Sequence, residues 1–300
     1  QRSLDLAKRY KDGARMATAL HDIGNLHAAQ HEYAEALAAY GESAALARSA
    51  GLHLLAARAQ GNAANALRQQ GRPREAEAAL QAAWVEVRQA PASHEAALTR
   101  IQIALGFRDL RAQFADPTAP LLRQAADGLN EAGAMAERLG DARGASYAWG
   151  HLGALYEAEQ RFDEALQLTR KAVFIAQRTN APESLYRWQW QAGRLLKQVG
   201  SFEEAIAAYR RAVHTLQSIR PEFSTGYGPA VSFRDSVGRV YFELVDLLLQ
   251  QAASLQDADR MALNLVEARD TVELFKLAEL RDYFRDDCVD AALSTLTKLD

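Results

Sequence analysis

The sequence of 300 residues contains a single cysteine, Cys288. An intramolecular disulfide is therefore excluded, which fits a reducing compartment, and we expect a cytoplasmic protein. Long apolar runs are also lacking, since stretches such as Leu247–Leu249 are short, and no transmembrane span is predicted. With 35 basic and 38 acidic residues, the net charge of −3 is too small to indicate a nucleic-acid-binding or membrane-binding protein.

Residues that favour β-strands are scarce as well. Val, Ile and Thr are few, whereas the helix-favouring Ala, Leu, Gln, Arg and Glu are abundant. Apolar and charged residues make up 49% and 24% of the chain, as in folded globular proteins rather than disordered ones. The composition therefore predicts an all-α fold.

Small residues recur at a constant interval. Ala36 and Ala76 are 40 residues apart, as are Ala165 and Ala205, and Ala125 lies 40 residues before Ala165. Such a period is typical of a solenoid in which each unit packs on its neighbours. We expect each unit to be two antiparallel helices, with these alanines at the closest approach on the second helix.

The first helices carry small residues at a matching place, and glycines mark some of the turns between helices. We expect Gly71 and Gly200 to supply such turns. The small residues of the first helices, which let the second helix approach, are Gly24, Ala64, Gly153 and Gly193.

These patterns resemble the tetratricopeptide repeat, whose standard length is about 34 residues. Two stretches carry the resemblance best, namely Trp149–Leu152–Gly153–Tyr156–Phe162–Ala165–Ala172 and Gly193–Gly200–Phe202–Ala205–Tyr209–Ala212. The resemblance implies a right-handed α-α superhelix of five to six helical hairpins plus a C-terminal helical hairpin. The longer period of this chain predicts helices longer by about a turn.

The predicted organisation has two parts. Residues 1–220 form the solenoid and residues 230–300 a divergent terminal helical hairpin, separated by the Pro- and Gly-rich stretch Arg220–Pro229. Residues 1–12 look like the tail of an earlier repeat, so we expect the chain to be a piece of a longer protein. The expected repeats are 14–50, 54–90, 93–140, 143–180 and 183–220, of which the third is degenerate and interrupted at Asp116–Pro120.

The C-terminal part is similar to the segment that joins such repeats to a CHAT domain, a caspase-like peptidase module of bacterial proteins. The similar stretches are Ser232–Val237, Val240–Leu244 and Glu273–Phe284. The resemblance implies a regulatory arm whose catalytic module would follow residue 300.

Residues for catalysis or metal binding are not evident. His31-Glu32 and His94-Glu95 begin like a zinc-protease helix, but Glu35 and Leu98 stand where its second His is required. Acidic neighbours would raise the pKa of the Cys288 thiol, which is the wrong direction for a nucleophile. We expect no catalytic residue, metal site or cofactor in this fragment.

The candidate binding site is the concave groove that first helices line in this repeat family. Asn side chains can hydrogen-bond a peptide backbone of any sequence, and Arg can capture carboxylates. Trp190 has two interpretations, packing with Tyr186 and Trp188 or stacking on a ligand side chain. The candidate groove residues are His21, Asn25, Arg58, Asn62, Asn65, Arg68, Arg187, Trp190, Arg194 and Lys197.

His21, Asn25, Asn62 and a basic residue near Arg100 partly resemble the family's carboxylate clamp. We therefore expect a protein or peptide partner with acidic groups or a free carboxylate. The predicted function is a non-enzymatic protein-interaction scaffold, the regulatory part of a CHAT protease. The alternative is a stand-alone adaptor or co-chaperone with no attached enzyme.

Overall fold

The computed structural model describes residues 2–114, 119–219 and 233–284. All regular secondary structure in these ranges is helical, which confirms the all-α prediction. No helix within the described ranges is long and apolar enough to cross a membrane. The chain divides into two compact units, residues 1–155 (unit 1) and 156–300 (unit 2).

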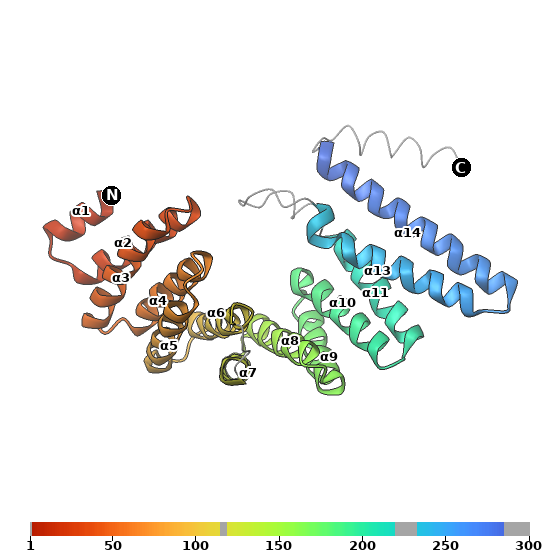
Figure 1. The fold of residues 1–300 in the computed structure, drawn as a ribbon, viewed down its shortest axis with the longest axis horizontal. Helices are drawn as coiled ribbons and strands as arrows, with labels where there is room; N and C mark the ends of the chain where they lie inside the picture. Colours follow the sequence, from red (N-terminus) through yellow and green to blue (C-terminus); the bar gives the residue numbers. More distant parts are fainter. Residues whose placement is uncertain (1, 115–118, 220–232, 285–300) are drawn as a thin grey trace. The chain divides into compact units, whose positions relative to one another are not determined.

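Unit 1 is a series of antiparallel helical hairpins, shown from red to yellow-green in Figure 1. Helices α2 and α3, α4 and α5, and α6 and α7 pack in pairs, and α3 also packs on α4. The helices are α1 (Arg2–Arg9), α2 (Gly13–Ala29), α3 (Tyr33–Ser49), α4 (His53–Gln69), α5 (Pro73–Gln89), α6 (His94–Arg111), α7 (Ala119–Arg138) and α8 (Ala142–Ala158), whose last three residues belong to unit 2.

Unit 2 continues the pattern with longer helices at its end. Helix α10 packs on α9 and α11, and α13 packs on α11 and along α14 (Figure 1). Both helices expected beyond residue 230 are present, whereas Arg220–Pro229, Asp116–Thr118 and Cys288 lie outside the described residues. The bounds are α9 (Phe162–Arg178), α10 (Pro182–Gln198), α11 (Phe202–Ser218), α13 (Phe233–Ser254) and α14 (Ala258–Phe284).

Several turns between helices share one backbone motif. At the end of α4 the Arg72 N–H donates to the Leu67 carbonyl at 3.0 Å, and Gly71 between them has a left-handed φ of 69°. This is the Schellman motif, in which backbone N–H groups after the helix donate to carbonyls of its last turn that lack a partner within the helix. Gly71 and Gly200 hold the predicted turn positions, but His31 and Asn180 adopt the same left-handed conformation without being glycine.

The recurring small residues lie where two helices meet. Ala36, Ala76, Ala165 and Ala205 are each at most 1% exposed, and Ala125 is fully buried. A Cβ added to Gly24 would lie 2.6 Å from the ring of Tyr40 on α3. The prediction that small side chains set the helix spacing is therefore confirmed, because a methyl group at that distance would clash.

Candidate functional site

Four predicted groove residues of unit 1 lie together on α4. Arg58, Asn62, Asn65 and Arg68 follow one another at helical spacing and line a groove of about 270 Å³ between α4 and α6. The α6 side of the groove carries apolar Ile103 and Leu110 together with polar Thr99, Gln102 and Asp109. A row of polar donors opposite a wall of mixed apolar and polar side chains suits an extended polypeptide segment.

Two side chains of this row keep hydrogen-bonding capacity free. Asn65 Oδ1 accepts from Arg68 Nη2 at 2.9 Å, and no described residue hydrogen-bonds Asn65 Nδ2. Within the described ranges, the Arg58 guanidinium also makes no hydrogen bond, and Arg58 is exposed. An amide and a guanidinium in this state are ready to donate to carbonyl or carboxylate oxygens.

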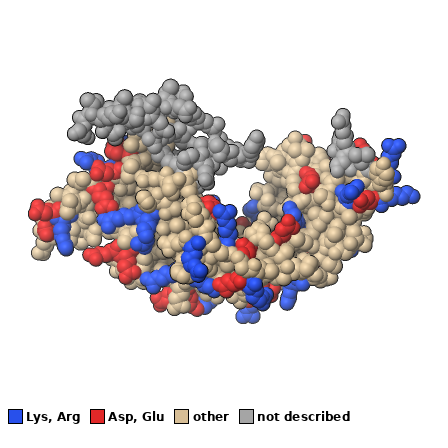
Figure 2. Space-filling model, turned by 180° about the vertical axis from the view of Figure 1, so that it is seen from behind, with Lys and Arg blue, Asp and Glu red and all other residues tan. Residues whose placement is uncertain are grey.

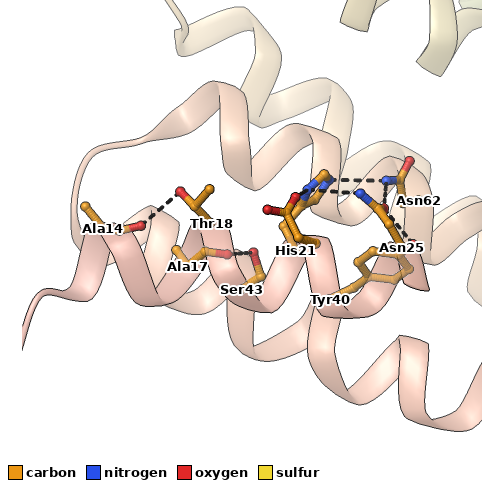
Figure 3. Close-up of polar contacts among 9 residues, drawn as sticks. Ala14, Ala17, Thr18, His21, Asn25, Tyr40, Ser43 and Asn62 are labelled. Carbon is orange, nitrogen blue, oxygen red and sulfur yellow. Dashed lines mark hydrogen bonds and ion pairs between the residues drawn. The ribbon is translucent and has the colours of Figure 1, made fainter. Parts of the chain in front are cut away.

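A second set of predicted residues forms a network beside the groove (Figure 3). Asn62 Nδ2 of α4 donates to Asn25 Oδ1 of α2 at 2.8 Å and lies 3.2 Å from His21 Nε2. The Tyr40 hydroxyl of α3 donates to the same Asn25 oxygen at 2.9 Å. His21 and Asn25 thus help to connect α2 with α3 and α4, and they are largely engaged by the protein itself.

One contact of the network favours a neutral His21. Asn62 Nδ2 can donate to His21 Nε2 only while that nitrogen carries no proton. Burial lowers the pKa of His21, which is 3% exposed, and the nearby positive charge of Arg58 lowers it further, although Asp22 acts in the opposite direction. Burial also raises the pKa of Tyr40, so its hydroxyl stays a donor.

Arg100 does not complete a carboxylate clamp. It is 5% exposed on α6, where its Nη1 lies 3.4 Å from Met135 Sδ of α7, and it does not line the groove beside Asn62. Burial lowers its pKa. The clamp interpretation is therefore not supported, because the α6 register turns this side chain toward α7 rather than the groove.

The predicted groove residues of unit 2 are engaged by acidic side chains. Arg194 Nε and Nη2 donate to the two carboxylate oxygens of Glu157 at 2.8 and 2.9 Å. The same guanidinium lies 4.7 Å from the centre of the Trp190 ring, whose Nε1 donates to Glu243 at 2.7 Å. Burial acts to lower the pKa of Arg194, but its bonds with Glu157 outweigh burial and raise it.

The remaining unit 2 candidates are also in contact with neighbours. Lys197 Nζ lies 3.2 Å from an Asp246 oxygen on α13, and the exposed Arg187 Nε donates to the Tyr186 hydroxyl at 3.2 Å. Tyr186 and Trp188 are buried, as the packing interpretation requires. The acidic residues of α13 that contact these candidates were not predicted from the sequence, because the pattern of each first helix does not include the helix that packs next to it.

Charges of both signs are interspersed on the surface. Lys and Arg alternate with Asp and Glu over the described part of the face in Figure 2. No group of three or more His, Cys, Asp or Glu in the described ranges could hold a metal ion. The polar groove of unit 1 is therefore the strongest candidate site among the described residues.

Comparison with known families finds two matches. Residues 15–83, which span α2 to most of α5, match a tetratricopeptide repeat model, and residues 188–213 match a second one. The first match contains Asn25, Tyr40, Asn62 and Asn65. No curated protein matches the sequence significantly.

Solved structures with the same fold include three diverse proteins. BtubC from P. vanneervenii has a TM-score of 0.61 and 21% identity, with 76% of this chain and 90% of that one covered. Aspartyl phosphate phosphatase F from Bacillus subtilis has a TM-score of 0.55 and 12% identity, with 89% and 73% covered.

The third is the Podosopora anserina putative kinesin light chain with nearly identical TPR-like repeats. Its TM-score is 0.55 and its identity 15%, over 70% of this chain and 98% of that one. At such identities the likeness concerns the fold alone. Together with the two matched segments, these structures establish that the chain is an all-α repeat solenoid that contains tetratricopeptide repeats.

Proposed function

We propose that the chain is a protein-interaction scaffold that holds an extended polypeptide segment in the groove between α4 and α6. The observation that supports this best is the row Arg58–Asn62–Asn65–Arg68, which includes unengaged donors opposite apolar side chains of α6 such as Ile103. Asn65 would bond the partner's backbone, and Arg58 and Arg68 would bind acidic groups or a free carboxylate. A groove of about 270 Å³ has room for a few side chains rather than a large cofactor.

We further propose that residues 1–220 form one solenoid and residues 230–300 lead to a caspase-like CHAT module that it regulates in the cytoplasm. Support comes from the similarity of the C-terminal part to such linkers, and α13 and α14 lie in that part. The alternative is a stand-alone adaptor or co-chaperone. Reading the gene beyond residue 300 decides between them, because a CHAT module requires a catalytic His and Cys on an α/β domain.

Groove binding is tested by the double variant Arg58→Ala/Asn65→Ala. Both residues line the groove and neither belongs to the network around Asn25, so the melting temperature should change little. Capture of polypeptides from the native host, identified by mass spectrometry, should fall about tenfold for the specific partner.

The matched control is Arg74→Ala/Asn130→Ala, which truncates the same residue types at exposed positions of α5 and α7. Its capture should equal that of the unaltered protein. Equal capture by both double variants would remove the groove from the proposal. Asn25 is unsuitable for this test, because Tyr40 and Asn62 bond to it and its loss would lower stability.

A further inference from the structure

Unit 2 carries a second groove on a different face of α10 from Trp190 and Arg194. It lies between α9 and α11, has a volume of about 320 Å³ and is floored by Ala192 and Leu196 of α10. Phe174 of α9 lines it and is 59% exposed, which is unusual for a large aromatic side chain in a folded protein. This second groove is separate from the site proposed above for the partner segment.

A buried amide opens into this groove. Gln189 of α10 lines the groove although it is 4% exposed, and the Thr215 hydroxyl lies 2.8 Å from its Oε1. No described residue hydrogen-bonds its Nε2. This nitrogen is therefore left to donate to an acceptor placed in the groove.

The rim of the groove is predominantly cationic. Arg211 of α11 is exposed, and its guanidinium has no hydrogen-bond partner among the described residues. Arg170 of α9 reaches Glu204 at 3.4 Å, a weak contact between side chains that are 61% and 65% exposed. Arg178 stands over the Phe174 ring at 5.5 Å. Two arginines and one acidic side chain therefore line the groove, and a third arginine lies over its exposed aromatic ring.

We propose that this groove is a second docking site, for an acidic polypeptide segment that carries an apolar anchor side chain. The anchor packs on Phe174 and Leu196, a carbonyl or carboxylate oxygen accepts from Gln189 Nε2, and flanking carboxylates pair with Arg170 and Arg211. Charge complementarity selects an acidic partner, since a basic segment would meet the arginine rim.

The test measures fluorescence anisotropy of three short labelled peptides with the whole chain. In the first, Glu and Asp flank a Leu-Phe pair. In the second, Lys replaces the acids, and in the third, Ala replaces Leu-Phe. The first should bind, and each of the others should bind at least about tenfold more weakly. If all three bind alike, or none binds, the proposal is overturned.

Variants locate the site on the protein. Arg170→Glu/Arg211→Glu should weaken binding of the acidic peptide at least about tenfold, and Phe174→Ala should weaken its binding as well. Arg74→Glu/Arg123→Glu, at exposed positions of unit 1, makes the same change in net charge and should leave binding unchanged. Equal loss in both charge-reversed proteins would show unspecific attraction and would contradict the proposal.

Two other occupants give distinguishable results. Arg170-dependent binding to vesicles of phosphatidylserine and phosphatidylcholine, without peptide binding, would assign the groove to a lipid surface. Self-association that Phe174→Ala abolishes, again without peptide binding, would assign it to a second copy of the chain. Either result overturns the proposal.

Gln189→Met, which removes the amide but keeps the volume of the side chain, should weaken binding of the acidic peptide without lowering the melting temperature.

Discussion

The two units pack their helices in the same way but surround the buried tyrosine with different polar groups. In unit 1 the ring of Tyr40 lies against Gly24, and in unit 2 the ring of Tyr209 lies against Gly193, each 2.6 Å from where a Cβ would stand. The Tyr40 hydroxyl donates to the neutral Asn25, whereas that of Tyr209 donates to the carboxylate of Glu243 at 2.6 Å. Burial raises the pKa of Tyr209, and its hydrogen bond to Glu243 makes a smaller contribution in the same direction.

The difference follows from side chains at equal positions. Three residues before the glycine stands His21 in unit 1 and Trp190 in unit 2, and one residue after it stands Asn25 or Arg194. The two units therefore share a backbone arrangement but differ in side chains. Unit 1 has neutral amides beside an open groove, whereas unit 2 has charged side chains that pair with one another. The groove of unit 1 has donors to offer, whereas in unit 2 Arg194 and Lys197 are already paired.

Removing an acid from unit 2 tests this comparison most strongly. Glu157→Gln should lower the free energy of unfolding by roughly 2 kcal/mol, because it leaves Arg194 in a mostly buried place without its carboxylate. Urea denaturation measures the change. Glu75→Gln is the control, since its partner Arg72 is in solvent and no measurable loss is expected. Similar small effects in both proteins would show that the ion pair of unit 2 contributes little.

Glycine substitutions test the shared packing. Gly24→Ala and Gly193→Ala should each destabilise the protein by about 1 kcal/mol or more, because the new Cβ overlaps a tyrosine ring by more than helix propensity can offset.

Gly61→Ala, at a first-helix position of α4, should have the opposite sign. Its Cβ would meet Ile103 at an ordinary 3.8 Å, so the gain in helix propensity should stabilise the protein by roughly 0.5–1 kcal/mol. Thermal and urea unfolding of the three variants measure the signs. A destabilised Gly61→Ala protein would contradict the assigned geometry of the α4–α6 groove.

The smallest expected effect is a pH dependence confined to unit 1. Because the folded-state pKa of His21 is lowered, its neutral form contributes fully above the unfolded value of about 6.5. As the pH falls below that value toward the folded pKa, the unfolded chain takes up the proton first and this stability is lost. His21→Asn should lose less stability than the unaltered protein between neutral and mildly acidic pH. The other histidines are common to both proteins, so the difference reports His21.

Much of the fold could be read from local pattern. The alanines and glycines at fixed spacing identified the helix pairs, and the helices beyond residue 230 were found at the expected places. Turns were predicted at positions where glycine is present, but His31 and Asn180 adopt the left-handed conformation at turns that have no glycine at this position. Asn and His adopt the left-handed region more readily than most residues other than glycine, so these turns remain compatible with residue preference.

The candidate site could be predicted less completely. Arg58, Asn62, Asn65 and Arg68 follow from helical periodicity on α4 and were found together. A basic residue near Arg100 was expected to complete a carboxylate clamp, but Arg100 faces Met135, because a shift of a few residues in α6 turns a side chain to another face.

The sequence alone determined that this protein is a stack of paired helices, since helix propensity and small residues at contact points act within or between adjacent segments. The tertiary structure alone decided which polar side chains are left to bind a partner. Whether Asn65 is open or Arg194 is paired depends on residues of other helices, such as Glu157 and Glu243, whose distance in space no local pattern encodes.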